Sequence, residues 1–122
     1  MPTSSQVIAI VDDDPAMLRG VERLLHALGY STQIFSSAEA FLGSADARTA
    51  TCVVLDIHLG GISGIELRRQ LSASGCELPV IFITAVDDAA TQKQAIEAGC
   101  IAYLLKPFSA RDLTDAIAKA AV

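Results

Sequence analysis

Charged and hydroxyl side chains follow or end four short apolar stretches of this 122-residue chain. Asp12 and Asp13 come directly after one stretch, and Asp56 comes directly after another. Thr84 ends a third stretch, and Lys106 follows a fourth. Carboxylates bind divalent cations, and a lysine and a hydroxyl beside the cation are suited to stabilise a phosphoryl group during its transfer. These five residues are therefore candidates for a metal-assisted phosphoryl site, provided that the fold brings them together.

Three carboxylates that meet at one site need compensation for their charge. Two carboxylates about 5 Å apart repel by roughly 3 kcal/mol at an effective dielectric of 20, so that a proton or a divalent cation must lie among them. Oxygen ligands with spare coordination positions favour Mg²⁺, or Mn²⁺. One carboxylate can then act as a nucleophile and form an aspartyl phosphate. We expect this nucleophile to be Asp56, because it stands alone, whereas the adjacent Asp12 and Asp13 are placed to bind the cation.

The elements that must position these residues alternate strictly along the chain. Apolar runs of about five residues are typical of strands buried on both faces of a parallel sheet, and helical stripes of apolar residues separate them. Five strands and five helices in this order predict one α/β doubly wound domain over residues 1–122, with its site outside the carboxyl ends of the strands. The predicted strands are Val7–Val11, Ser31–Phe35, Cys52–Leu55, Val80–Thr84 and Ile101–Leu105; the predicted helices are Pro15–Leu28, Ser37–Leu42, Gly64–Ser72, Asp88–Ala98 and Ser109–Ala121.

The composition excludes several classes of function. A formal net charge of −5 argues against direct binding of nucleic acid by this chain, because neutralising phosphates requires a basic patch. No stretch has the length and apolar character of a membrane span, and the first residues do not resemble a signal peptide. Three cysteines without C-x-x-C spacing, Cys52, Cys76 and Cys100, predict free thiols. We therefore expect a cytoplasmic protein with no membrane partner.

Five motifs occur in order along essentially the whole chain, and together they resemble the receiver domain of response regulators, the chemotaxis-regulator-like phosphoacceptors of bacterial two-component systems. The resemblance implies a flavodoxin-like sheet of order 2-1-3-4-5, in which the first and third strands are neighbours and their carboxylates converge. It also implies a signalling domain that catalyses only its own phosphorylation and dephosphorylation. The motifs are Val11-Asp12-Asp13-Asp14, Val54-Leu55-Asp56-Ile57-His58-Leu59, Gly64, Phe82-Ile83-Thr84-Ala85 and Leu105-Lys106-Pro107-Phe108.

The resemblance assigns a role to each residue of the candidate site. Asp56 would accept a phosphoryl group from the phosphohistidine of a sensor histidine kinase or phosphotransfer protein. Asp13 would bind Mg²⁺ directly, Asp12 would bind it through water, and the backbone carbonyl of His58 would be a further ligand. Lys106 would pair with the phosphoryl oxygens.

The resemblance further implies a switch that conveys phosphorylation to a partner. Thr84 would move toward the phosphate, and Tyr103 would turn inward behind it. The movement would reshape the face formed by the last two predicted helices and the strand between them. That face would engage a downstream protein partner or a fused output domain, and a homodimer through the two helices is possible, with Lys93, Glu97 and Arg111 at the contact. The peptide before Pro107 is commonly cis in this family.

The sequence departs from the family pattern in the loop after Asp56. The family usually has proline four residues after the phosphoacceptor, where this chain has Gly60, followed by Gly61. A double glycine makes the loop more flexible and more costly to order. His58 and Val86 occupy positions that in the family tune the lifetime of the phosphoryl group.

Two other functions remain open from the sequence. Asp12-x-Asp14 after an apolar strand also resembles the phosphatase motif of haloacid dehalogenases, in which Asp12 would be the nucleophile. Alternatively, the chain is a receiver-shaped docking module that acts without phosphorylation. Asp14, which precedes Pro15, is expected only to cap the following helix. The sequence does not distinguish a stand-alone receiver from a domain of a longer regulator.

Overall fold

A five-stranded parallel sheet in the order β2-β1-β3-β4-β5 forms the centre of the computed structural model, which describes residues 6–45 and 47–120. The order confirms the expected flavodoxin-like topology. The register places Val11 beside Leu55 and Thr84 beside Leu105, so that the strands end at a common edge. The strands are β1 (Val7–Val11), β2 (Ser31–Phe35), β3 (Cys52–Asp56), β4 (Val80–Thr84) and β5 (Ala102–Leu105).

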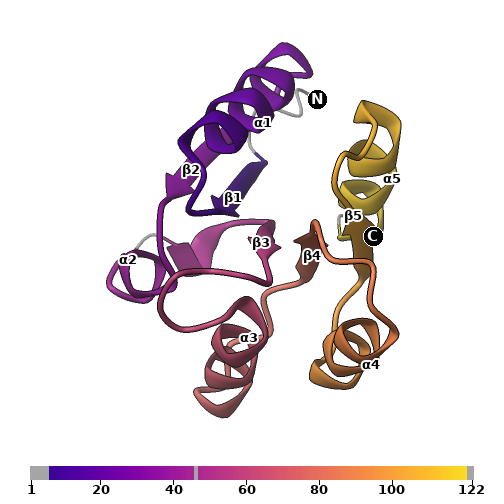
Figure 1. Cartoon of the computed structure of the whole chain (residues 1–122). Helices are drawn as coiled ribbons and strands as arrows, with labels where there is room; N and C mark the ends of the chain where they lie inside the picture. The colour runs from indigo at the N-terminus through magenta and orange to yellow at the C-terminus, as the bar shows by residue number, and fades with distance from the viewer. Residues whose placement is uncertain (1–5, 46, 121–122) are drawn as a thin grey trace.

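Helices cover both faces of the sheet (Figure 1). Helices α1 and α5 lie on one face, and α2, α3 and α4 lie on the other. This arrangement is that of the predicted doubly wound fold. The helices are α1 (Pro15–Ala27), α2 (Ala38–Leu42), α3 (Gly64–Ala73), α4 (Ala89–Ala98) and α5 (Ala110–Ala120), with a short 3₁₀ helix, η2 (Ala47–Thr49).

The side chains of the inner strands alternate between two apolar clusters, one on each face of the sheet. Ile8, Val54 and Ile83 lie in the cluster under α1 and α5, whereas Leu55 and Phe82 lie in the cluster under α2, α3 and α4. Every residue of β3 and β4 is buried, which explains why these strands read as continuous apolar runs. Full burial of each large apolar side chain contributes about 1.5–3 kcal/mol. The sheet is therefore a rigid base for the residues at its carboxyl edge.

Helix boundaries differ from the predicted ones mainly at the caps. Asp14, Ser37 and Asp88 precede α1, α2 and α4 with extended backbone, and each accepts a hydrogen bond from a backbone amide in the first turn. Asp14 is thus a helix cap, as predicted. Ser37 and Asp88, predicted as the first helical residues, lie just outside their helices for the same reason.

The remaining differences are small. Asp56 is the last residue of β3, β5 begins one residue later than predicted, and η2 was not predicted. Ala121, predicted to end the last helix, lies outside the described residues. The three cysteines are free, as expected, and burial raises the pKa of the Cys52 thiol to about 12. Within the described part of the chain, no helix is long and apolar enough to span a bilayer.

Candidate functional site

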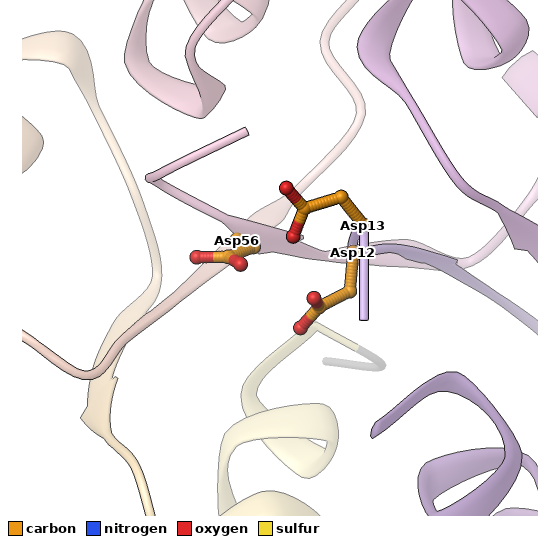
Figure 2. Close-up of side chains that lie close together, drawn as sticks. All are labelled: Asp12, Asp13 and Asp56. Atoms are coloured by element: carbon orange, nitrogen blue, oxygen red, sulfur yellow. The ribbon is translucent and has the colours of Figure 1, made fainter. Parts of the chain in front are cut away.

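Three carboxylates converge at the carboxyl edge of the sheet (Figure 2). Because Val11 and Leu55 are register partners, the residues that follow them, Asp12 and Asp56, are neighbours across β1 and β3. One carboxylate oxygen from each of Asp12, Asp13 and Asp56 lies within 4.8 Å of the other two. Asp12 and Asp56 are buried, with 0% and 4% of their surface exposed, whereas Asp13 is exposed. The structure thus brings together the three acids that the sequence predicted.

Lys106, which directly follows the outer strand β5, reaches the carboxylates along the same carboxyl edge of the sheet. Its Nζ lies 2.9 Å from Oδ2 of Asp12 and 3.2 Å from Oδ2 of Asp56. Its backbone N–H donates to the carbonyl of Thr84 at 2.8 Å, which fixes the chain after β5, and the Lys106–Pro107 peptide is cis. One ammonium cannot balance three carboxylates, so that negative charge remains in excess at a mostly buried site.

The electrostatics of Asp56 reflect this excess of negative charge. Burial and the charge of Asp12 raise its pKa, and this outweighs the lowering by the backbone N–H of His58, which donates to Oδ1 at 3.1 Å, and by Lys106. Burial lowers the pKa of Lys106, but its bonds to Asp12 and Asp56 outweigh burial and raise it above the usual range. Any further positive charge near the carboxylate of Asp56 would therefore stabilise its ionised form.

The donor set fits a hard divalent cation. Each of the three carboxylates offers an oxygen, and the exposed Asp13 leaves the cluster open to solvent on one side. Oxygen ligands of this kind, with positions left for water or a phosphoryl oxygen, suit Mg²⁺ or Mn²⁺. The side chain of His58 is exposed, whereas its backbone lies two residues after Asp56 and donates its N–H to Oδ1 of that carboxylate. The residues present therefore fit the metal that the sequence predicted.

Thr84 at the end of β4 and Tyr103 in β5 are not part of the carboxylate cluster. Thr84 is fully buried, and its Oγ1 accepts a hydrogen bond from the N–H of Val86 at 3.1 Å. The hydroxyl of Tyr103 is buried, with no hydrogen-bond partner in the described part of the chain. Burial, followed by the charges of Asp87 and Asp88, raises the pKa of Tyr103. Neither hydroxyl bonds to the three carboxylates among the residues that the structure describes.

Sequence reasoning missed one residue at this edge. Glu39, in α2, accepts a hydrogen bond from the backbone of Ile62 in the loop after β3. The double glycine beside Ile62 indicated that the loop was unusual, but nothing in the sequence indicated which side chain approaches it.

Comparison with known proteins gives one consistent family. The family model described as the response regulator receiver domain matches residues 8–118. Response regulator protein TodT of Pseudomonas putida is 36% identical over 117 residues, which cover 96% of this chain and 52% of TodT. Transcriptional regulatory protein FixJ of Bradyrhizobium diazoefficiens is 32% identical over 118 residues, which cover 97% of this chain and 58% of FixJ. The chain thus spans about half the length of these curated relatives.

Solved structures agree with the sequence matches. The crystal structure of FixJ-N superimposes with a TM-score of 0.85 at 31% identity, covering 94% of this chain and 92% of that one. The BeF3-activated DrrB receiver domain superimposes with a TM-score of 0.84 at 33% identity, covering 95% of this chain and 97% of that one. The match extends over the sheet and the helices on both of its faces.

Proposed function

This chain belongs to the response regulator receiver domain family, and on that premise we propose that it accepts a phosphoryl group on Asp56 from a phosphohistidine. The observation that carries the proposal is the position of Lys106. Its ammonium contacts both Asp12 and Asp56, beside a third carboxylate, at the edge of the sheet where ligands bind in this fold.

The residues of the site divide the work of phosphoryl transfer between them. A carboxylate oxygen of Asp56 attacks phosphorus as the bond to the donor imidazole breaks. The ammonium of Lys106, which contacts the carboxylate of Asp56 before transfer, can then pair with the oxygens of the phosphoryl group bound to Asp56. Mg²⁺ or Mn²⁺, when held by Asp12, Asp13, Asp56 and the backbone carbonyl of His58, supplies positive charge to the phosphoryl oxygens. The buried walls around Asp12 and Asp56 exclude water and strengthen these interactions.

We propose that Thr84 and Tyr103 convey phosphorylation to the surface. The hydroxyl of Thr84 can turn toward a phosphoryl oxygen, which would release the N–H of Val86 and alter the loop before α4. Tyr103, whose buried hydroxyl lacks a hydrogen-bond partner in the described chain, can respond to that change. The affected face consists of α4, β5 and α5.

The proposed partners follow from the surface and from the relatives. A groove of about 390 Å³ beside the site can receive part of a phosphodonor, that is, a sensor histidine kinase or a phosphotransfer protein. Because this chain matches about half of its curated relatives, its output is proposed to pass to a fused domain or to a separate protein in the cytoplasm. The acidic chain itself is not proposed to bind nucleic acid. The groove is lined by Asp14, Ala16, Met17, Gly20, Val21, Leu24, Pro107 and Phe108.

Intact mass after incubation with acetyl phosphate tests the proposal. We expect a gain of about 80 Da, one phosphoryl group, that requires Mg²⁺ and is absent from Asp56→Asn. A gain that persists in Asp56→Asn but disappears in Asp12→Asn would instead support the phosphatase alternative, against which family membership argues. If acetyl phosphate gives no gain, phosphohistidine on a histidine kinase is the next donor. Signalling that is unchanged by Asp56→Asn would support the docking module.

A further inference from the structure

The loop between β3 and α3 begins directly after Asp56 and lacks the proline that the family usually has there. We propose that Glu39 of α2 is a positioning residue, which holds this loop and therefore the backbone that follows Asp56 in place for the cation. The inference rests on the proposed function of the site for its metal-binding part. Its structural part, the restraint of the loop by Glu39, stands on the contacts alone.

The loop is fixed by hydrogen bonds near both ends, and its middle is held by one hydrogen bond and by apolar packing. At its start, the N–H of Ile57 donates to Ile83 at 3.0 Å, and at its end the N–H of Gly64 donates to Ile57 at 2.9 Å. For residues 59–62, the structure of the described chain gives one hydrogen bond, from the N–H of Ile62 to Oε2 of Glu39 at 3.3 Å. The hydrogen bonding of the middle of the loop thus depends on a side chain 23 residues away, in addition to the packing of Leu59 and Ile62 against the core.

Gly61 allows the carboxylate of Glu39 to approach this closely. A Cβ atom on Gly61 would lie 2.6 Å from Oε2 and 3.2 Å from Oε1 of Glu39, closer than real Cβ atoms come to Oε2. Gly61 does not have a positive φ, unlike Gly29, Gly75 and Gly99, so that its backbone conformation does not require glycine. An alanine at position 61 would therefore have to displace the flexible carboxylate of Glu39 from this position.

Gly60 places the restrained loop directly beside a proposed metal ligand. A Cβ atom on Gly60 would lie 3.9 Å from Oδ2 of Asp13, an ordinary van der Waals contact. The φ of Gly60 is not positive, and its N–H makes no hydrogen bond to the described residues, so that proline can replace it without losing a bond. Proline would restrict the same loop through its own ring, which makes Gly60→Pro a substitute for the contact with Glu39.

Two measurements test the role of Glu39, one without metal and one with it. Amide hydrogen exchange by NMR in metal-free buffer reports the restraint of residues 59–62. Titration with Mg²⁺, followed by calorimetry, reports the affinity of the site. We expect Glu39→Ala to speed exchange at Ile62 and to weaken Mg²⁺ binding by roughly fivefold, the effect of losing one hydrogen bond. Glu39→Gln, which keeps an acceptor oxygen, should restore most of both.

Glu66→Ala is the matched control. Glu66 is also an exposed acidic residue in the first turn of a helix, in α3, so the variant removes the same charge without touching the contact with Ile62. Equal effects of Glu66→Ala and Glu39→Ala on Mg²⁺ affinity would show a general effect of charge and overturn the proposal. So would parental exchange at Ile62 in Glu39→Ala.

Combined variants test the mechanism of the restraint. Gly61→Ala displaces the carboxylate and should weaken Mg²⁺ binding as much as Glu39→Ala, with no further loss when both are combined. Gly60→Pro should recover affinity in the Glu39→Ala background. Full additivity of Gly61→Ala and Glu39→Ala would overturn the proposed contact. If the parent protein binds no Mg²⁺ but Glu39 still protects Ile62, the proposed function and the metal-binding part fail, and the restraint itself is supported.

Discussion

Asp56 carries its negative charge at a cost to the folded state, and this cost has a defined dependence on pH. Its pKa in the folded protein lies above the ordinary value of 3.8, mainly through burial and then through Asp12. The folded protein therefore binds a proton more tightly than the unfolded chain. Stability is consequently lost as the pH rises from the ordinary value through the raised one, and the loss persists at neutral pH.

Asp56→Asn removes this cost. In metal-free buffer at neutral pH, we expect the free energy of unfolding of the variant to be higher by on the order of 1 kcal/mol. The variant should therefore unfold at a higher urea concentration than the parent protein. The difference should shrink toward zero as the pH falls to about the ordinary value of 3.8, because the parent carboxyl is then neutral as well. Urea unfolding at several pH values checks this, and a difference that does not change with pH would contradict it.

At the residue scale, the sequence predicted the carboxylates and the lysine but not their indirect support. Asp12, Asp13 and Lys106 follow strands and Asp56 ends one, and the carboxyl ends of parallel strands share one edge, so that the strand order brings them together. Glu39 lies on a helix and its side chain contacts a loop. The spacing of apolar residues predicts helices and strands, but it does not predict the path of a loop. Its contact with Ile62 could be found only in three dimensions.

At the element scale, the close contact between α3 and β3 is the most demanding part of the fold. A Cβ atom on Gly64 would lie 2.3 Å from the backbone oxygen of Asp56, so that only glycine fits at the start of α3. The sequence identified Gly64 as part of a motif but did not reveal this reason. Any larger residue must push the helix away from the strand that ends in Asp56.

Gly64→Ala should therefore destabilise the protein by about 1–3 kcal/mol, the usual effect of overpacking, and weaken its binding of Mg²⁺. Gly20→Ala in α1 is the control, because a Cβ atom on Gly20 would have no neighbouring atom within 4 Å and the helix is exposed there. That variant should gain about 0.5–1 kcal/mol from alanine's better helix propensity. Thermal unfolding of both variants tests this prediction. Equal melting temperatures would contradict the inference that a Cβ atom fits at Gly20 but not at Gly64.

Most strand boundaries were predictable, whereas the capping residues Ser37 and Asp88 were wrongly predicted as the first residues of their helices. Strands β1, β2 and β4 begin and end as predicted, because polar or turn residues bound their runs of strand-forming side chains. The 3₁₀ helix η2 was not predicted, since three residues are too few to show a helical period. Its place is determined by Ala47 and Ala50, which pack into the core from the connection between α2 and β3.

At the scale of the whole molecule, the face of α4, β5 and α5 is the proposed route of output. Ile96 on α4 is 60% exposed, the highest value among the exposed large apolar side chains of the described residues, and Leu105 at the end of β5 is 40% exposed. Lys93, Glu97 and Arg111 provide charged groups on the two helices that frame them. This combination of exposed apolar and charged groups suits a second copy of the chain or another partner.

If the phosphorylated protein dimerises, we expect it to do so through this face. Ile96→Asp should weaken a phosphorylation-dependent dimer at least tenfold, and charge reversal at Lys93, Glu97 or Arg111 should weaken it less. Arg23→Glu on α1, an exposed site on a helix that is not part of this face, should have no effect. Analytical ultracentrifugation with and without acetyl phosphate measures this, and a dimer indifferent to all four face variants would exclude the face.

The ion pair between Lys106 and Asp12 joins residues 94 positions apart, nearly the full span of the folded chain. During synthesis, the acidic end of the sheet therefore emerges from the ribosome long before the only cation that contacts it in the described structure. Until β5 has been made and has docked, Asp12 and Asp56 lack their counter-charge. Under the proposed function, a nascent chain could not receive a phosphoryl group at this stage, so that phosphorylation would itself report that translation has passed Lys106.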